Sequence, residues 1–305
     1  MEISQKSYLN YLNQVFPHWG NNDVFKWHYK NEIFKTPTDI FVLTETNSGK
    51  NEIAAGSTVV YREMDIDQKT EIKIGIMSGS WTLPEYRGKG FFTKTIEKSL
   101  ELTRIKNADA LCAFVTEANA SSRRLIAAGS IVIPTFYIFY EKKNSEHNVD
   151  IYGVEKMNIS NIVLKRLFYS YQQYKKNKLC FSYDFNSFVE QFINRPQNIY
   201  LLKIKERLFI IEENADTIKV LFAEKNQNEK PKNFTEDLLC LGLWASGNCN
   251  RKLYYFTTNE YEKELLLVMN FNVLGGYFTI LPSQSIRELD FISHSCFEIN
   301  LGDKM

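Results

Sequence analysis

The 305-residue sequence has few cysteines and no pairing pattern among them. There are five, an odd number, and none belongs to a C-x-x-C pair. Scattered cysteines of this kind are typical of reduced thiols and not of a disulfide framework or a zinc site. We therefore expect no metal ion and a cytoplasmic location. The five residues are Cys112, Cys180, Cys240, Cys249 and Cys296.

Charge excess and long hydrophobic runs are missing too. The 37 Lys and Arg residues nearly balance 36 Asp and Glu, and the net charge of +1 argues against nucleic acid or an anionic membrane as a partner. No apolar run approaches the roughly 20 residues that span a bilayer, and the polar residues 1–6 do not read as a signal peptide. Hydrophobic residues still make up 44% of the chain, so we expect a globular protein with room for two domains.

A turn rich in glycine and basic residues joins an apolar strand to a helix. The apolar run of the strand covers 72–83, the turn at 87–90 reads Arg-Gly-Lys-Gly, and the helix begins at Phe91. Glycine lets the backbone approach a ligand closely, because it has no Cβ. The unpaired amides at the helix start and two positive charges favour a pyrophosphate. The spacing fits neither a Walker loop nor a three-glycine dinucleotide fingerprint.

The segment Arg87-x-x-Gly90-x-Phe92 resembles the Arg/Gln-x-x-Gly-x-Gly/Ala signature of the GCN5-related N-acetyltransferases, the GNAT superfamily, which bind acyl-CoA there. Phe92 departs from the signature, which has a small residue at that position. The resemblance implies acyl-CoA as the donor and places its contacts on the end of the strand, the turn and the first helical turn. These residues are Trp81, Thr82, Leu83, Arg87, Gly88, Lys89, Gly90, Phe91, Phe92 and Thr93.

A second segment, residues 110–129, resembles the family's Asn-x-x-Ser/Ala-x-x-Leu-Tyr-x-x-x-Gly-Phe element. The resemblance adds Asn119 and Ser122 as residues beside the pantetheine and the thiol. Both also suit the start of a helix as capping residues. Ile126 stands where the family usually has Tyr, the proton donor to the leaving thiolate. The usual general acid is therefore missing from its expected place.

The whole pattern predicts an α+β fold of two tandem GNAT-like domains, each with a mixed, mostly antiparallel sheet flanked by helices. The first domain is expected over 1–145 and the second over 146–305, with the polar stretch 141–149 as the boundary. No glycine turn precedes the helix at 233–247, so we expect the second domain to be degenerate and to lack a CoA site; an unrelated α+β domain is the alternative. Expected strands are 39–43, 53–63, 70–83, 110–116, 130–140, 198–205, 207–213, 217–224, 252–258 and 273–281, and expected helices are 7–15, 24–29, 91–105, 159–176, 185–193 and 233–247, with two more from Ala120 and Asn259.

The catalytic base has two candidates. Acyl transfer from a thioester to an amine needs a neutral amine, a polarised carbonyl and a protonated thiolate. Glu117 ends a strand beside the expected thioester, and His28 has a pKa suited to the task. A capping carboxylate and a packed histidine are the alternative interpretations. A site that selects the neutral amine needs no base at all.

The acceptor is argued by resemblance. Trp27, His28 and Tyr29, the length and the tandem arrangement resemble the bacterial dTDP-3-amino-3,6-dideoxyhexose N-acyltransferases, which act on nucleotide-linked amino sugars for surface polysaccharides such as lipopolysaccharide. The resemblance implies a CoA thioester and a nucleotide sugar as partners, these three residues on a wall of the acceptor pocket, and a monomer or homodimer.

Three other functions stay open. One is an acyltransferase for another amine, such as an antibiotic, a polyamine or a peptide. A second resembles the tandem aminoacyltransferases that use aminoacyl-tRNA, and the intact CoA turn and the lack of basic excess argue against it. The third is a non-catalytic acyl-CoA-binding protein, which Phe92 and Ile126 favour.

Overall fold

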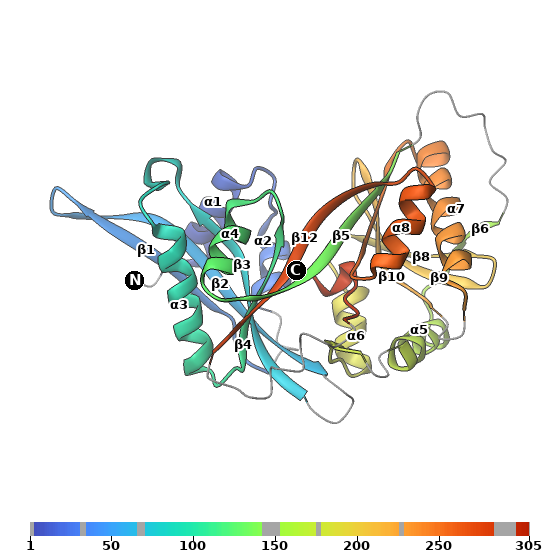
Figure 1. Cartoon of the computed structure of the whole chain (residues 1–305), viewed down its shortest axis with the longest axis horizontal. Helices are drawn as coiled ribbons and strands as arrows, with labels where there is room; N and C mark the ends of the chain where they lie inside the picture. The colour runs from blue at the N-terminus through green and yellow to red at the C-terminus, as the bar shows by residue number, and fades with distance from the viewer. Residues whose placement is uncertain are drawn as a thin grey trace.

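The computed structural model describes residues 3–30, 35–65, 71–141, 153–174, 178–225, 229–283 and 297–304. The molecule is elongated, and the two halves of the chain lie side by side along its length (Figure 1). Within these ranges, no helix combines the length and the apolar character needed to cross a bilayer.

The first half forms the elements that the pattern predicts. Two helices begin at Ser4 and Asn21, whose side-chain oxygens accept hydrogen bonds from the first helical amides, as capping residues do. The predicted strands are present, and the second extends further than expected at both ends. In order, the elements are α1 (Gln5–Val15), α2 (Asn22–Tyr29), β1 (Asp39–Asn47), β2 (Lys50–Asp65), β3 (Glu71–Thr82), the 3-10 turn η1 (Pro84–Tyr86), α3 (Phe91–Ile105), β4 (Ala110–Thr116), α4 (Ala120–Ala127) and β5 (Ile131–Tyr140).

The second half repeats this order. Its long helix starts at Pro231, earlier than predicted, because proline suits the first helical position, and it ends at Asn250 in the left-handed conformation. Two short strands, β6 and β7, were not predicted. The elements are β6 (Val154–Met157), α5 (Asn161–Tyr174), β7 (Cys180–Phe181), α6 (Phe185–Phe192), β8 (Asn198–Ile204), β9 (Arg207–Glu213), β10 (Thr217–Ala223), α7 (Pro231–Cys249), β11 (Lys252–Thr257), α8 (Glu260–Val268), β12 (Asn272–Pro282) and the 3-10 turn η4 (Leu301–Asp303).

The two halves share one sheet and exchange a strand. The strand order is β1-β2-β3-β4-β12-β5-β11-β10-β9-β8-β6. β12, from the second half, pairs antiparallel with both β4 and β5, and β5 pairs with β11. β5, the last strand of the first half, therefore lies between β12 and β11 of the second half. β12, the last strand of the second half, lies between β4 and β5 of the first. The sheet is mixed and mostly antiparallel, as predicted, whereas nothing in the sequence pattern predicts the exchange. The expected boundary at 145/146 lies outside the described residues and stays a prediction.

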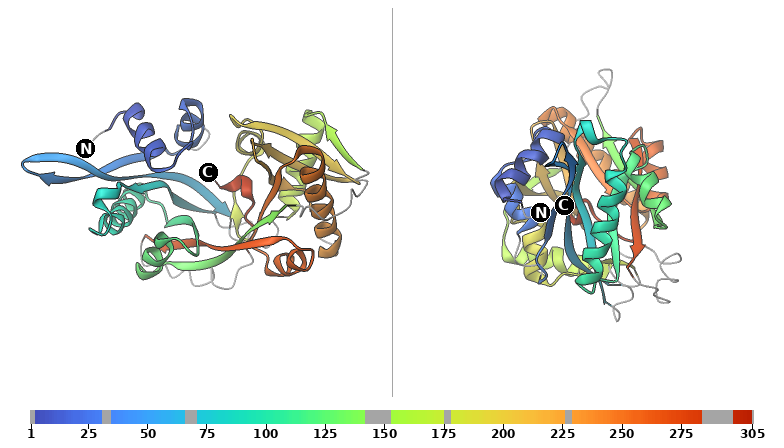
Figure 2. Two further views of the ribbon diagram at one scale, coloured as in Figure 1. Left: turned by 90° about the horizontal axis from the view of Figure 1, so that it is seen from above. Right: turned by 90° about the vertical axis from the view of Figure 1, so that its left-hand side faces the viewer.

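Helices cover both faces of the sheet. In the first half α1 and α2 lie on one face and α3 and α4 on the other (Figure 2). The largest buried cluster crosses the middle of the molecule, because it contains Ile76 and Cys112 from the first half together with Phe188 and Phe222 from the second. The largest cluster of the hydrophobic core is thus common to both halves.

Candidate functional site

The candidate site lies where two parallel strands diverge. β3 and β4 pair from Ile74 opposite Ala110 to Ile76 opposite Cys112 and are not paired beyond that point. The divergence coincides with a β-bulge in β3, since Gly79 and Ser80 both oppose the single residue Ser57 of β2. Backbone groups of β3 beyond Ile76 therefore face an opening and not a neighbouring strand. This opening is a cavity of about 770 Å³, here called the splay cavity.

Gly79 allows this bulge. Its φ of +54° lies in the left-handed region, and a Cβ there would collide with the hydroxyl of Tyr29. The Tyr8 hydroxyl approaches the Gly79 carbonyl oxygen at 3.4 Å. Helices α1 and α2 thus support the bulge from behind, and Val15 and Phe16 at the end of α1 reach the cavity wall.

The mouth of the splay cavity is the turn predicted from the sequence. Gly88 and Gly90 both have φ of +79°, and the surrounding space at both positions is open. Gly90 is the N-cap of α3 and offers no side chain to the first amides of the helix. The amides of Phe91, Phe92 and Thr93 therefore have no partner within the helix, at the positive end of its dipole. This arrangement suits an anionic group.

Most of the predicted donor contacts meet at this cavity. Those that line it are Trp81, Thr82, Arg87, Gly88, Gly90, Phe91, Phe92, Thr93 and Asn119. The indole of Trp81 itself is buried against Tyr11, with ring centroids 5.0 Å apart, and against the bare backbone of Gly56. The contribution of Trp81 to a ligand is thus confined to its backbone.

The other three predicted donor residues lie elsewhere. Leu83 is buried in the core between the sheet and α1 and α2. The Lys89 amine pairs with Glu45 at 3.2 Å and lies over the Tyr86 ring, and Lys89 is not among the described residues that line the cavity. The buried Ser122 hydroxyl donates to the backbone oxygens of Glu117 and Asn119, at 3.0 and 2.7 Å, and serves the start of α4.

Arg87 differs from Lys89. Its side chain is exposed, lines the splay cavity and has no acidic partner in the part of the chain that the structure describes. Arg124 of α4 lines the same cavity. Ile126 is 44% exposed, and Leu125 takes the place on the cavity wall. Two guanidinium groups and the α3 amides therefore give the cavity a positive character, with no acidic residue among the described residues that line it.

Neither predicted base lines the splay cavity. His28 packs against Trp19, Trp27 and Tyr29, and burial, assisted by the charge of Arg195, lowers the pKa of its imidazole to about 3. An imidazole with this pKa is a weak base.

Glu117 faces β12. Its carboxylate accepts a hydrogen bond from the Tyr277 hydroxyl at 3.2 Å and lies over the backbone of Gly275. The role of either His28 or Glu117 in proton transfer stays a prediction.

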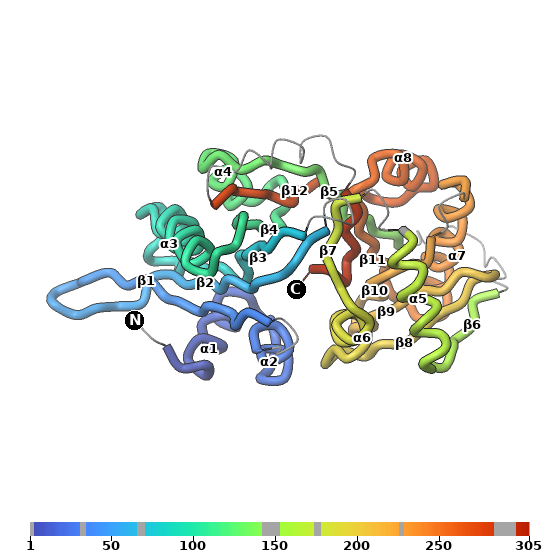
Figure 3. Tube along the Cα trace, turned by 90° about the horizontal axis from the view of Figure 1, so that it is seen from below, coloured from blue at the N-terminus to red at the C-terminus, as the bar shows by residue number. Residues whose placement is uncertain are grey.

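The predicted acceptor residues occupy a seam between the halves. Trp27 donates its indole N–H to the backbone oxygen of Glu190 at 3.4 Å, and Tyr29 is buried behind Gly79. Figure 3 shows α2 on the same side of the molecule as α6. Trp27, His28 and Tyr29 do not line the splay cavity, so their predicted contact with an acceptor stays untested.

Sequence reasoning missed Lys304, which lines the splay cavity. Its amine donates to the Tyr137 hydroxyl at 2.7 Å and lies 4.0 Å from the centroid of that ring. Burial, assisted by the charge of Lys219, lowers the pKa of this amine to about 7. No local motif marks this residue, because tertiary contacts alone bring it to the cavity.

The second half has a counterpart of the splay cavity that is already filled. β10 and β11 pair from Thr217 to Lys219 and then diverge, as β3 and β4 do. The segment 297–304 enters this gap, and η4 contacts both strands. Gly302 permits the close approach, since a Cβ there would collide with the Phe192 ring.

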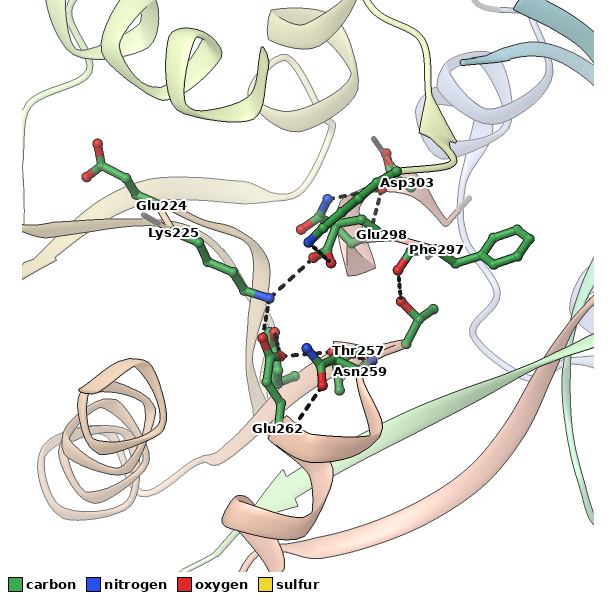
Figure 4. A network of polar contacts seen from close by, with 12 residues as sticks. Glu224, Lys225, Thr257, Asn259, Glu262, Phe297, Glu298 and Asp303 are labelled. Atoms are coloured by element: carbon green, nitrogen blue, oxygen red, sulfur yellow. Dashed lines mark hydrogen bonds and ion pairs between the residues drawn. The ribbon is translucent and has the colours of Figure 1, made fainter. Parts of the chain in front are cut away.

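Polar contacts hold this inserted segment in place. Lys225 pairs with Glu262 at 2.7 Å and with Glu298 at 3.3 Å (Figure 4). The buried Asp303 carboxylate accepts from the Tyr183 hydroxyl and from the backbone amide of Asn300. The chain itself thus fills the gap of the second half that corresponds to the splay cavity of the first.

The helix start in the second half is also unlike its counterpart. α7 begins without a glycine turn, beside a polar cavity. Its acidic lining residues are Glu206, Glu224, Glu229, Glu236 and Asp237, and its cations Arg166 and Lys205 pair with Glu224 and Asp237. Arg207 pairs with Glu229 and with Asp237, the latter at 2.9 Å. Cations at this place are already neutralised, and the carboxylates disfavour a phosphate.

Within the described ranges, no group of three His, Cys, Asp or Glu side chains is arranged to hold a metal ion.

Comparison with known proteins identifies the fold. No family model and no curated protein matches the sequence. Among solved structures, the chain is similar to Saccharomyces cerevisiae N-myristoyltransferase with bound myristoyl-CoA and inhibitors, with a TM-score of 0.62, 9% identity, and coverage of 91% of this chain and 77% of that one.

Two bacterial structures are similar as well. A GCN5-related N-acetyltransferase from Anabaena variabilis has a TM-score of 0.55 at 13% identity and covers 93% of this chain and 72% of its own. A conserved Enterococcus faecalis protein of unknown function, described as a probable N-acyltransferase, has a TM-score of 0.55 at 9% identity, with coverage of 90% and 68%. These likenesses confirm the predicted GNAT-like fold.

Proposed function

We propose that the protein is an acyl-CoA-dependent N-acyltransferase whose donor binds in the splay cavity. One observation carries the proposal: the unpartnered α3 amides, the unpaired Arg87 and the divergence of β3 from β4 all open into the same cavity. A pyrophosphate at the α3 N-terminus receives hydrogen bonds from the amides of Phe91 to Thr93 and charge from Arg87.

The rest of the donor fits the opening between the strands. Pantetheine carries two amide groups, and the backbone of β3 beyond Ile76 has free positions to pair with them. With the pyrophosphate at the turn and the pantetheine along β3, we infer that the thioester lies near Phe114 and Lys304, which also line the cavity. The similarity in fold to an enzyme solved with bound myristoyl-CoA supports an acyl-CoA as the donor.

For the acceptor, we propose the amine of a nucleotide-linked amino sugar, such as a dTDP-3-amino-3,6-dideoxyhexose, used in surface polysaccharide synthesis. The support is the resemblance in tandem arrangement and in the Trp27, His28 and Tyr29 element. A non-catalytic acyl-CoA-binding protein is the second candidate, and the exposed Ile126 in place of a proton-donating tyrosine favours it.

The test is thiol release from acetyl-CoA with four acceptors: a dTDP-3-amino-3,6-dideoxyhexose, spermidine, kanamycin and a short peptide with a free amino terminus. We expect turnover with the nucleotide sugar. Turnover with another amine alone would support the acyltransferase activity and exclude the nucleotide sugar as the acceptor. Tight CoA binding with no turnover on any amine would exclude the acyltransferase proposal and support a non-catalytic acyl-CoA-binding protein.

A further inference from the structure

Lys304 reaches the splay cavity from the far half of the molecule. Its segment runs from Phe297, which pairs with Leu179, through η4 in the gap between β10 and β11. Figure 2 shows the η4 turn between the two halves. The second half thus delivers one side chain to the cavity of the first.

Few residues of the cavity wall can exchange a proton near neutral pH. Among the described residues that line the cavity, the titratable side chains are Tyr86, Arg87, Arg124 and Lys304. Arginine keeps its proton in proteins. Tyr86 lies at the mouth, and its hydroxyl donates to Glu52 at 2.6 Å, which raises its pKa to about 12. Of these four side chains, Lys304 is therefore the one that can exchange a proton near neutral pH.

The surroundings of Lys304 accommodate both protonation states. The amine faces the Tyr137 hydroxyl of β5 and the rings of Phe114 on β4 and Phe256 on β11. The loss of solvent on burial, and then the positive charge of Lys219 on β10, favour the neutral amine. The aromatic faces, with centroids 4.0 to 5.4 Å from Nζ, stabilise the ammonium when it forms.

The other charged and titratable groups nearby are committed elsewhere. The Asp303 carboxylate accepts from Tyr183 and from the Asn300 amide, and its backbone oxygen accepts from Arg62. Lys219 pairs with Glu212 at 2.8 Å. Burial raises the pKa of Tyr137 to about 12, so this hydroxyl stays protonated at neutral pH. The Lys304 amine therefore has no carboxylate partner among the groups described around it.

We propose that Lys304 is the proton carrier of acyl transfer in the splay cavity, an inference that rests on the proposed function. The neutral Lys304 amine takes a proton from the acceptor ammonium. The freed amine attacks the thioester carbonyl, the new N–C bond forms, and the C–S bond breaks. The Lys304 ammonium then gives its proton to the leaving thiolate, and the proton lost by the new amide nitrogen passes to water. One proton is released for each acyl group transferred.

The first experiment measures protonation without turnover. The full chain is labelled with ¹³C at the lysine ε-carbon and titrated by NMR, with Lys304→Arg identifying the Lys304 signal. We expect this signal to titrate with a midpoint near pH 7, whereas a midpoint near the ordinary lysine value of about 10.4 would overturn the proposal.

The second experiment separates a proton carrier from a fixed charge. Lys304→Met and Lys304→Arg are compared with the exposed control Lys165→Met, using acetyl-CoA and the fastest acceptor of the panel. We expect both Lys304 variants to lose about 10²–10⁴-fold in kcat at pH 7, with unchanged CoA affinity and without the wild-type midpoint in the pH profile. Rescue by arginine, or kcat equal to wild type, would refute the assignment.

The two proposals fail differently. A wild-type protein that acylates no amine contradicts the proposed function, while the NMR midpoint still reports on Lys304. A wild-type protein that turns over normally when Lys304 is replaced contradicts only this inference. Intact mass after incubation with acetyl-CoA adds one more outcome: an acyl group retained on Lys304 would make it a nucleophile and overturn its role as a proton carrier.

Discussion

The guanidinium of Arg195 stacks on the indole of Trp27, with Cζ 4.3 Å from the ring centroid. Trp27 belongs to α2 in the first half, and Arg195 follows α6 in the second, where it also pairs with the buried Glu212 at 3.3 Å. This contact links α2 of the first half to the segment that follows α6 in the second half. Together with the exchanged strand and the common core, it makes the two halves one unit.

A fragment ending at residue 145 should therefore not fold. It would lack β12, which pairs with β4 and β5, and would expose the part of the core that Ile76 and Cys112 share with the second half. We expect an insoluble or unfolded fragment by circular dichroism, and a single unfolding transition for the full chain. A soluble fragment with a cooperative transition would contradict the shared core.

Gly90→Glu should abolish CoA binding, and Gly90→Gln is its matched control. Both side chains enter open space and impose the same strain at φ of +79°, but only Glu places a negative charge beside the pyrophosphate. Calorimetry with CoA is the measurement. Equal affinity of the two variants would show that the anion is not bound at this turn.

Arg87→Ala should weaken CoA binding by roughly 1.5–3 kcal/mol, the range for hydrogen bonds to charged groups. Lys89→Ala is the comparison and should have a much smaller effect, because its amine pairs with Glu45. The loss in Arg87→Ala should appear in the Michaelis constant for acyl-CoA. A collapsed turnover number with an unchanged Michaelis constant would give Arg87 another role.

Each chain should bind one CoA. The counterpart gap between β10 and β11 holds the segment 297–304, and carboxylates of Glu229 and Asp237 lie near the start of α7. Calorimetric stoichiometry is the measurement, and Gly90→Glu should remove all of the binding. Residual binding in that variant would reveal a second site.

Stability should rise with pH above neutrality more in the wild type than in Lys304→Met. Lysine has a pKa of about 10.4 in an unfolded chain, and burial lowers that of folded Lys304 to about 7. Between these values the unfolded state binds a proton that the folded state lacks, so the free energy of unfolding increases with pH. We expect a difference of about 2 kcal/mol between pH 7 and 9 from urea unfolding; parallel pH profiles would contradict the lowered pKa.

Local chemistry made much of the site predictable. The glycine turn from Arg87 to Gly90 and the start of the helix at Phe91 follow from a turn pattern that the sequence displays directly. Asn119 was added by the family resemblance, and the binding role of all these residues stays a prediction. Lys89 was assigned to the cavity because nothing in the turn reveals Glu45, which comes from β1. Lys304, Val15 and Phe16 depend on contacts between segments far apart in sequence, and periodicity carries no such information.

The strand exchange was unpredictable for a similar reason. β5 and β12 have the alternation of ordinary strands, and either could pair with its own half. The choice of neighbour is decided by the packing of the whole sheet. The order of elements was therefore predictable, and the way in which the halves join was not.

The place of β12 has a consequence for synthesis on the ribosome. β4 and β5 emerge well before the strand that lies between them, and the residues that fill the gap between β10 and β11 come later still. Until β12 is synthesised, the edges of β4 and β5 that it pairs with are unpaired, and unpaired strand edges promote aggregation. We expect nascent chains that stall before residue 272 to require chaperone protection, although the glycine turn at 87–90 is by then already complete.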